Sequence, residues 1–200
     1  HGIGRRQRQM CIRDSTYNRI RRLGAIRNAF RRSGPRLTWI ATDGLRPAVV
    51  EPHPARPDDV ALLQLTSGST AQPKGVEITH ANLVHQLQMN CEELGLVRGS
   101  RAVLWVPQYH DLGLISGMLS AVFGNGRLWM MSPLSFLHRP ALWMEVMHRV
   151  QATATAAPDF GYALVTRKTT AAQRARWDLS NLTMAMSAGE PVRPATRAAF

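Results

Sequence analysis

The sequence has little of what marks several classes of protein. Its two cysteines, Cys11 and Cys91, stand 80 positions apart, which is neither a zinc-binding spacing nor a disulfide scaffold. Its longest apolar-leaning run, residues 112–123, has 12 residues, whereas a membrane span needs roughly 18 or more. It has no GxSxG motif, which argues against a hydrolase, and no signal peptide opens it. We therefore expect a cytoplasmic protein with no membrane span and no metal-ligand cluster.

Lysine is scarce, and the positive charge is carried mainly by arginines near the start of the chain. Of the formal net charge of +12, residues 1–36 contribute +10 through eleven arginines and one acid, and residues 37–200 contribute only +2. The charge is therefore not spread over the folded part, and we expect no nucleic-acid partner. Binding of the basic segment to phosphate or to an anionic surface is the less favoured alternative, because few aromatic residues are interleaved with it.

The first 59 residues contain three kinds of sequence. Residues 8–15 resemble translated adapter sequence, so we expect residues 1–15 to be a non-native basic segment. An exposed basic segment of the protein itself is the alternative. Residues 16–59 begin with apolar residues at helical spacing and continue with four prolines within residues 45–59, which predicts a helix followed by a proline-rich connector.

From residue 60 onward, short apolar runs alternate with longer helical patterns. Strands are predicted at residues 60–65, 102–106, 127–131, 153–157 and 183–187, the first of them buried. Helices are predicted at residues 80–94, 112–123, 140–150 and 160–170, and a further helix begins at residue 194. Thr79 is a suitable N-cap for the first helix. This alternation predicts an α/β fold with a largely parallel sheet, in which ligands bind beside the carboxyl ends of the strands.

The loop that follows the first of these strands carries an unusual set of side chains. Residues 66–75 contain four hydroxyl groups, two glycines and Lys74, one of only two lysines in the chain. Glycine lets backbone amides approach an anion, hydroxyls donate to phosphate oxygens, and lysine supplies a positive charge. The spacing is not that of a Walker A loop, because Pro73 precedes the lysine and Gly75 follows it. A phosphate-binding loop is favoured over an ordinary polar surface loop.

Several strings of the sequence are similar to those of one enzyme family. Residues 66–75, TSGSTAQPKG, resemble the phosphate-binding signature of adenylate-forming enzymes, with Ala71 where glycine is usual. Residues 105–115, WVPQYHDLGLI, resemble the WxPxYHDMGLI string of fatty acyl-AMP ligases. Three later strings resemble that branch too: MSPLSFLHRP at 131–140, APDFGY at 157–162 and SAGEPVR at 187–193. Their order is preserved from about residue 37 to residue 200, so the chain is identified as resembling the fatty acyl-AMP ligases of the AMP-dependent synthetase/ligase superfamily.

The resemblance implies a role for each group of site residues. Those that would hold the ATP phosphates are Thr66, Ser67, Gly68, Ser69, Thr70, Lys74 and Gly75. Those that would lie against adenine are Gly189, Glu190 and Pro191. Those that would lie near the acyl chain are Asp159, Phe160 and Tyr162, although the two aromatic residues could instead belong to the core. His110 would be catalytic, at the junction of the acyl carboxylate and the adenylate, with a structural histidine as the alternative. Asp111 is expected to cap the helix that follows it.

The implied reaction activates a fatty acid with ATP and Mg²⁺, giving an acyl-adenylate and pyrophosphate for transfer to an acyl carrier protein. An acyl-CoA synthetase that uses coenzyme A, or a non-catalytic nucleotide-binding remnant, is the alternative. In the family, the magnesium-binding acid and a mobile C-terminal domain with a catalytic lysine come later in the sequence. We therefore expect residues 60–200 to be an incomplete N-terminal adenylation domain, inactive alone, with the magnesium ligand beyond residue 200.

Overall fold

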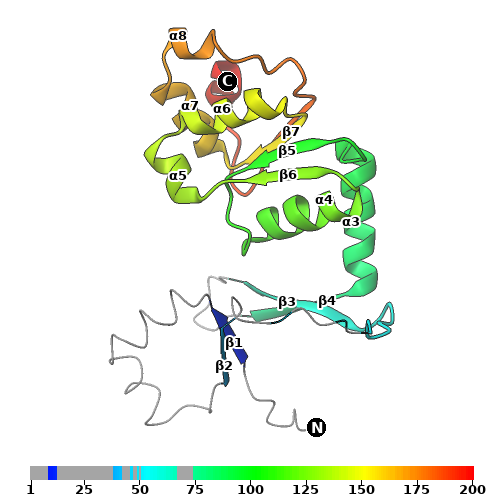
Figure 1. Cartoon of the computed structure of the whole chain (residues 1–200). Helices are drawn as coiled ribbons and strands as arrows, with labels where there is room; N and C mark the ends of the chain where they lie inside the picture. Colours follow the sequence, from blue (N-terminus) through cyan, green and yellow to red (C-terminus); the bar gives the residue numbers. More distant parts are fainter. Residues whose placement is uncertain (1–8, 13–37, 42–45, 47–48, 50, 67–73) are drawn as a thin grey trace, which may run out of the picture. The chain divides into compact units, whose positions relative to one another are not determined.

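The computed structural model describes residues 9–12, 38–41, 46, 49, 51–66 and 74–200. The chain divides into two compact units, His1–His53 and Pro54–Phe200. In the first unit, strands β1 (Gln9–Ile12) and β2 (Thr38–Ala41) pair in parallel (Figure 1). Neither strand is predicted from the sequence. The helix predicted after residue 16 lies outside the described residues.

The second unit is built on a four-stranded parallel sheet. Its strands are β5 (Arg101–Leu104), β6 (Arg127–Met130), β7 (Ala154–Ala157) and β8 (Met184–Ser187). They lie in the order β6-β5-β7-β8, and all three neighbouring pairs are parallel. Figure 1 shows β5 between β6 and β7. The predicted α/β fold with a parallel sheet is confirmed. Strands β6, β7 and β8 fall within the ranges predicted for them, and β5 begins one residue before its predicted range.

One helix precedes the first strand of this sheet, and other helices connect its strands. Helix α3 (His80–Leu94) begins after the predicted N-cap Thr79, whose hydroxyl accepts a hydrogen bond from the Asn82 amide at 3.2 Å. It ends at Gly95, which has a left-handed φ of 64°. The helices that follow it in the described part of the chain are η2 (Leu112–Leu119), α4 (Ser120–Phe123), α5 (Pro133–His138), α6 (Ala141–Val150), α7 (Asp159–Lys168), α8 (Ala171–Arg174) and α9 (Pro194–Ala199). No helix among the described residues is long and apolar enough to cross a membrane.

The core joins the helices α5, α6 and α7 to the sheet. Its fully buried large side chains include Trp143, Phe136, Met147 and Val165. Burying one such side chain stabilises the fold by roughly 1.5–3 kcal/mol. Two polar side chains of the core are hydrogen-bonded, since the Trp143 indole donates to the Thr155 hydroxyl at 3.1 Å, and that hydroxyl donates to the Val103 carbonyl at 2.7 Å.

One strand differs from its predicted setting. Strand β3 (Val60–Thr66) forms at the predicted place, but it pairs antiparallel with β4 (Lys74–Thr79) in a separate two-stranded hairpin. The prediction that this strand is buried is wrong, because Leu63 and Leu65 are 63% and 69% exposed. Among the described residues, no third strand pairs with this hairpin, so its apolar run is not enclosed as it would be in the middle of a parallel sheet.

Candidate active site

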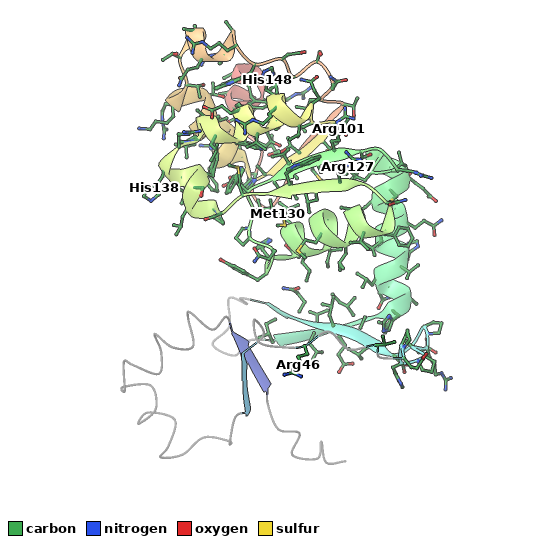
Figure 2. The ribbon with its side chains drawn as sticks, viewed as in Figure 1. Arg46, Arg101, Arg127, Met130, His138 and His148 are labelled. Carbon is green, nitrogen blue, oxygen red and sulfur yellow. The ribbon has the colours of Figure 1, made fainter. Side chains whose placement is uncertain are left out.

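The loops after the four parallel strands meet at one edge of the sheet. Because all four strands run in the same direction, residues 105–111, 131–132, 158 and 188–193 all follow carboxyl ends. Figure 2 marks this direction, with Arg127 at the start of β6, Met130 at its end and His138 at the end of the helix that follows. His110, Asp159 and Glu190 follow β5, β7 and β8, so they belong to the carboxyl edge of the sheet, where ligand-binding residues were expected.

Aromatic rings pack beneath this edge. Trp105, which follows β5, is 3% exposed and stacks on Phe136, with ring centroids 3.9 Å apart. Phe160 lies edge-on to the same indole at 5.6 Å and remains 41% exposed. Gly161 is required beside the indole, because a Cβ atom there would lie 2.5 Å from a Trp105 ring carbon. Trp105, Phe136 and Phe160 thus form an aromatic cluster at this edge of the sheet, in which Phe160 is partly exposed.

Two buried polar atoms at this edge have no hydrogen-bond partner among the described residues. They are the indole Nε1 of Trp105, just after β5, and the hydroxyl of Ser187, the last residue of β8. Leaving such a group unpaired costs about 1–3 kcal/mol.

His110 and Asp111 are held at the start of η2. His110 Nδ1 lies 2.6 Å from Asp111 Oδ1, and both side chains are more than half exposed, at 59% and 61%. Asp111 Oδ1 also accepts from the Leu112 amide at 2.6 Å, which confirms the prediction that Asp111 caps this helix. The Leu112 amide also lies 3.2 Å from His110 Nδ1 and donates to it when that nitrogen carries no hydrogen. When Nδ1 does carry the hydrogen, the ring donates to Asp111 and Nε2 is the acceptor. The helix start lies directly on the loop before it, since a Cβ atom on Gly113 would lie 2.1 Å from the Pro107 carbonyl oxygen.

Asp159 is the most buried acid at the site, and its oxygens are fully engaged. It is 1% exposed and accepts hydrogen bonds from the Arg193 amide at 3.1 Å, from Arg193 Nε at 2.5 Å and from the Thr196 hydroxyl at 3.1 Å. Burial alone would raise the pKa of Asp159, but these hydrogen bonds and the Arg193 charge outweigh it and lower the pKa. Asp159 therefore ties the start of α7 to the start of α9 as an ionised carboxylate.

The loop after β8 is fixed to the same helix start. Glu190 Oε1 accepts from the Phe160 amide at 2.6 Å, which satisfies a backbone donor in the first turn of α7. Gly189 has a φ of 87°, a conformation that side chains other than glycine rarely adopt. Gly189, Glu190 and Pro191 are all exposed. The loop thus presents an open surface on a fixed backbone.

Tyr162 lies in the interior. It is 4% exposed, its hydroxyl donates to the Met186 carbonyl at 2.7 Å, and burial raises its pKa. Its ring packs against Trp143 and Phe200, with centroids 5.2 Å and 4.8 Å away. The sequence left open whether Tyr162 lies near the acyl chain or in the core, and these contacts favour the core. Contact of Tyr162 with an acyl chain stays a prediction.

The predicted phosphate loop is described only at its ends. The hairpin register places Thr66 opposite Lys74 and Leu65 opposite Gly75, so the two ends of the loop meet. Ser67, Gly68, Ser69 and Thr70 lie outside the described residues. The strands on either side of the loop therefore pair antiparallel, and neither belongs to the parallel sheet.

Comparison with known proteins places these features in a family. Residues 15–200 match the family described as AMP-binding enzyme. The chain belongs to the AMP-binding enzyme family. Among its relatives are two proteins named medium-chain-fatty-acid–[acyl-carrier-protein] ligase, JamA of Moorena producens and TtuA of Teredinibacter turnerae. JamA is 39% identical over 165 residues, covering 80% of this chain and 28% of its own length. TtuA is 39% identical over 155 residues, covering 76% and 23%.

Solved structures agree with this membership. The fold matches the fatty acyl-adenylate ligase from L. pneumophila, solved in complex with acyl adenylate and pyrophosphate, with a TM-score of 0.82 and 27% sequence identity. The match covers 96% of this chain and 32% of that one. This member of the AMP-binding family thus spans only about a quarter to a third of the length of these relatives.

Sequence reasoning missed the partners that hold the site residues of this family member. Arg193 and Thr196 lie 34 and 37 positions after the Asp159 that they bind. Phe136, which stacks on Trp105, stands inside a recognised string but was given no role. An acid in the first turn of a helix that follows a strand, with an arginine after a later strand, is the signal that could have pointed to the Asp159–Arg193 pair.

Proposed function

We propose that the full-length protein activates a medium- or long-chain fatty acid as an acyl-adenylate and passes the acyl group to an acyl carrier protein. The observation that carries this proposal is the 39% identity to two proteins named medium-chain-fatty-acid–[acyl-carrier-protein] ligases, over more than three quarters of the chain. The similarity to a fatty acyl-adenylate ligase fold supports the same chemistry.

The proposed first step joins two anions. A carboxylate oxygen of the fatty acid attacks the α-phosphorus of ATP, the bond from that phosphorus to the bridging oxygen of the β-phosphate breaks, and pyrophosphate leaves. No proton has to be transferred, so catalysis consists mainly of positioning and of neutralising negative charge. A second step exchanges the adenylate for the thiol of the carrier, releasing AMP.

The hairpin loop has the right donors for the phosphates. Hydroxyls, glycine amides and a lysine are the groups that bind phosphate oxygens, and the hairpin register brings the two ends of the loop together. We assign phosphate contacts to this whole set: Thr66, Ser67, Gly68, Ser69, Thr70, Lys74 and Gly75. ATP supplies the adenylate and the leaving group, and Mg²⁺ is expected to be held by a residue that follows this part of the family sequence.

The edge of the parallel sheet fits the adenylate and the acyl chain. The exposed loop of Gly189, Glu190 and Pro191 is assigned to adenine, and the exposed His110 to the junction of carboxylate and phosphate. Phe160, with its free ring face beside Trp105, is assigned to the acyl chain. The polar atoms of Asp159 and Tyr162 are already bonded to Arg193 and to the Met186 carbonyl. We therefore assign these two residues to holding the acyl-binding surface in place.

The acceptor is tested by product analysis. The full-length protein is incubated with a medium-chain fatty acid, ATP and Mg²⁺, and with either coenzyme A or a phosphopantetheinylated carrier protein. Mass spectrometry is expected to show acyl-AMP and acylated carrier, with little acyl-CoA. Rapid accumulation of acyl-CoA without preference for the carrier would favour an acyl-CoA synthetase. Absence of every acylated product would favour a non-catalytic nucleotide-binding protein.

A further inference from the structure

A buried chain of hydrogen bonds connects α3 to the helix that starts after His110. Gln86 Nε2 donates to Asn90 Oδ1 at 2.9 Å, and Asn90 Nδ2 donates to Ser120 Oγ at 3.0 Å. Ser120 Oγ in turn donates to the Ile115 carbonyl at 2.9 Å. Ser120 is completely buried and Asn90 is 6% exposed. Asn90 and Ser120 are thus enclosed between helices and bonded to each other, whereas Gln86 is exposed.

The carbonyl at the end of this chain belongs to an unusual helix. Residues Leu112–Leu119 form a π-helix, η2, and the Ser120 amide also donates to the Ile115 carbonyl, five residues back. Fewer than 1% of residues in soluble proteins are in π-helices, and such turns are frequent at functional sites. Ser120 therefore bonds the same carbonyl through its backbone and its side chain, which stabilises the wide turn at this point.

The hydrogen-bond register of η2 affects which way the His110 side chain points, because His110 immediately precedes this helix. Asp111 caps η2, and the His110 carbonyl accepts from the Leu114 amide at 2.8 Å, so both residues are joined to its first turn. The helix packs closely on the strand and loop before it, since an added Cβ atom would lie 2.1 Å from the Pro107 carbonyl oxygen at Gly113 and 2.6 Å from a Leu104 side-chain carbon at Gly117. Narrowing η2 to an α-helix would shift its register by one residue, a rotation of about 100°. The hydrogen bonds at Ser120 oppose that rotation.

We propose that Asn90 and Ser120 are positioning residues, which hold His110 in its working direction by fixing the π-register of η2. The inference rests on the proposed function, in which His110 lies beside the reacting carboxylate. Burying an amide and a hydroxyl between two helices costs free energy that apolar side chains would not, whereas a fully bonded polar pair fixes one arrangement of those helices. The pair therefore serves the geometry of the site in addition to the stability of the fold.

The test uses Ser120→Ala in the full-length protein, with Ser116→Ala as the matched control from the same helix. Ser116 is half-buried, and no hydrogen bond of its hydroxyl is found among the described residues. Ser120→Ala is expected to lower kcat for acyl-adenylate formation about tenfold or more while KM for ATP changes less than about twofold, because a misplaced group costs rate more than binding. Ser116→Ala is expected to keep kcat within about twofold of the wild-type value.

The decisive comparison repeats Ser120→Ala in a His110→Ala background. If Ser120 acts through His110, the second substitution costs little further rate once the imidazole is gone. Equal losses in both backgrounds would overturn the inference, and so would an unchanged kcat in His110→Ala, since nothing would then need positioning. Failure of the wild-type protein to form acyl-AMP would instead overturn the proposed function, and the inference with it.

A second pair of variants keeps the inference testable if Ser120→Ala does not fold. Gln86→Ala removes the donor that orients Asn90. Gln88→Ala removes a nearby exposed glutamine of the same helix, which donates to Glu92 Oε1 at 2.7 Å. Gln86→Ala is expected to lower kcat by about two- to fivefold, and Gln88→Ala to leave it unchanged. Equal kcat values for the two variants would contradict the inference.

Discussion

Three acidic side chains at the sheet edge bind three helix starts in different ways. Asp111 is exposed and caps η2 through the next residue's amide. Glu190 reaches across from the loop after β8 to the first turn of α7. Asp159 is buried and ionised because Arg193 and Thr196 donate to it. Negative charge is favourable at all three places, where free amide groups and the helix dipole are positive. The three acids therefore hold the starts of η2, α7 and α9 in place at the carboxyl edge of the sheet.

Lys74 gives the sharpest prediction at the residue scale, because the chain has one other lysine for comparison. Lys74→Ala in the full-length protein is expected to lower kcat by roughly ten- to a thousandfold, the range for one lost electrostatic contact with a transition state. Its melting temperature is expected to change little. Lys168→Ala, at the end of α7, is the matched control and is expected to leave kcat unchanged. A large loss of stability with normal kcat in Lys74→Ala would show a packing role instead.

Asp159 predicts a pH dependence of stability. Its pKa is lowered in the folded state, so its ionised form stabilises the fold above the ordinary pKa, and this contribution is lost as the pH falls through the folded-state pKa. Asp159→Asn is expected to lower the free energy of unfolding in urea at about pH 7, with the difference from wild type shrinking toward about pH 3. The exposed Asp58→Asn serves as the control. A difference that is the same at both pH values would contradict the assigned charge state.

The elements that the sequence predicted well carry their signals locally. Thr79, the apolar face from Leu83 to Leu94 and Gly95 bound α3 within one stretch of chain. The hairpin was harder to predict, because the apolar run of β3 looks like a buried parallel strand and β4 follows a loop motif. The π-register of η2 depends on Asn90, which lies 30 positions from its partner Ser120. Contacts of this range leave no periodic trace in a sequence.

At the candidate site, too, the local strings could be predicted from the sequence and the long-range contacts could not. The strings that carry His110, Phe160 and Glu190 were recognisable by resemblance, and strand order placed their loops at one edge. The bonds that fix them were not predictable, because they join the ends of different strands, as Glu190 joins the Phe160 amide 30 positions away. Register and side-chain direction decide such contacts, and both come from tertiary packing.

The cap of α3 can be tested directly. Thr79→Ala removes the oxygen that accepts from the Asn82 amide and is expected to lower the free energy of unfolding by about 1 kcal/mol. Thr79→Ser keeps that oxygen and is expected to stay close to wild type. Chemical denaturation of the three proteins measures both differences. Equal stability of Thr79→Ala and wild type would show that the cap contributes nothing.

The packing of α7 on the loop after β5 depends on Gly161. Gly161→Ala is expected to lower the free energy of unfolding by about 1–3 kcal/mol, although alanine favours helix, because its methyl group would collide with Trp105. The loss is expected to be smaller when Trp105→Leu makes room. Equal losses in the two backgrounds, measured by thermal unfolding, would rule out the collision as the cause.

At the scale of the whole molecule, two structures of different kinds carry the assigned site. The antiparallel hairpin holds the phosphate loop, and the carboxyl edge of the parallel sheet carries the groups assigned to adenine, carboxylate and acyl chain. Both belong to the unit Pro54–Phe200. The chain covers 28% of JamA and 23% of TtuA.

Acid-dependent exchange of pyrophosphate into ATP tests the central claim most directly, because it reports the reversible formation of acyl-adenylate without any acceptor. The full-length protein is incubated with ATP, Mg²⁺ and labelled pyrophosphate, with and without a medium-chain fatty acid. We predict rapid incorporation of label into ATP only when the fatty acid is present, and its loss in Lys74→Ala but not in Lys168→Ala. Exchange that is absent, or that proceeds equally without the fatty acid, would contradict the proposal that this protein forms fatty acyl-adenylates.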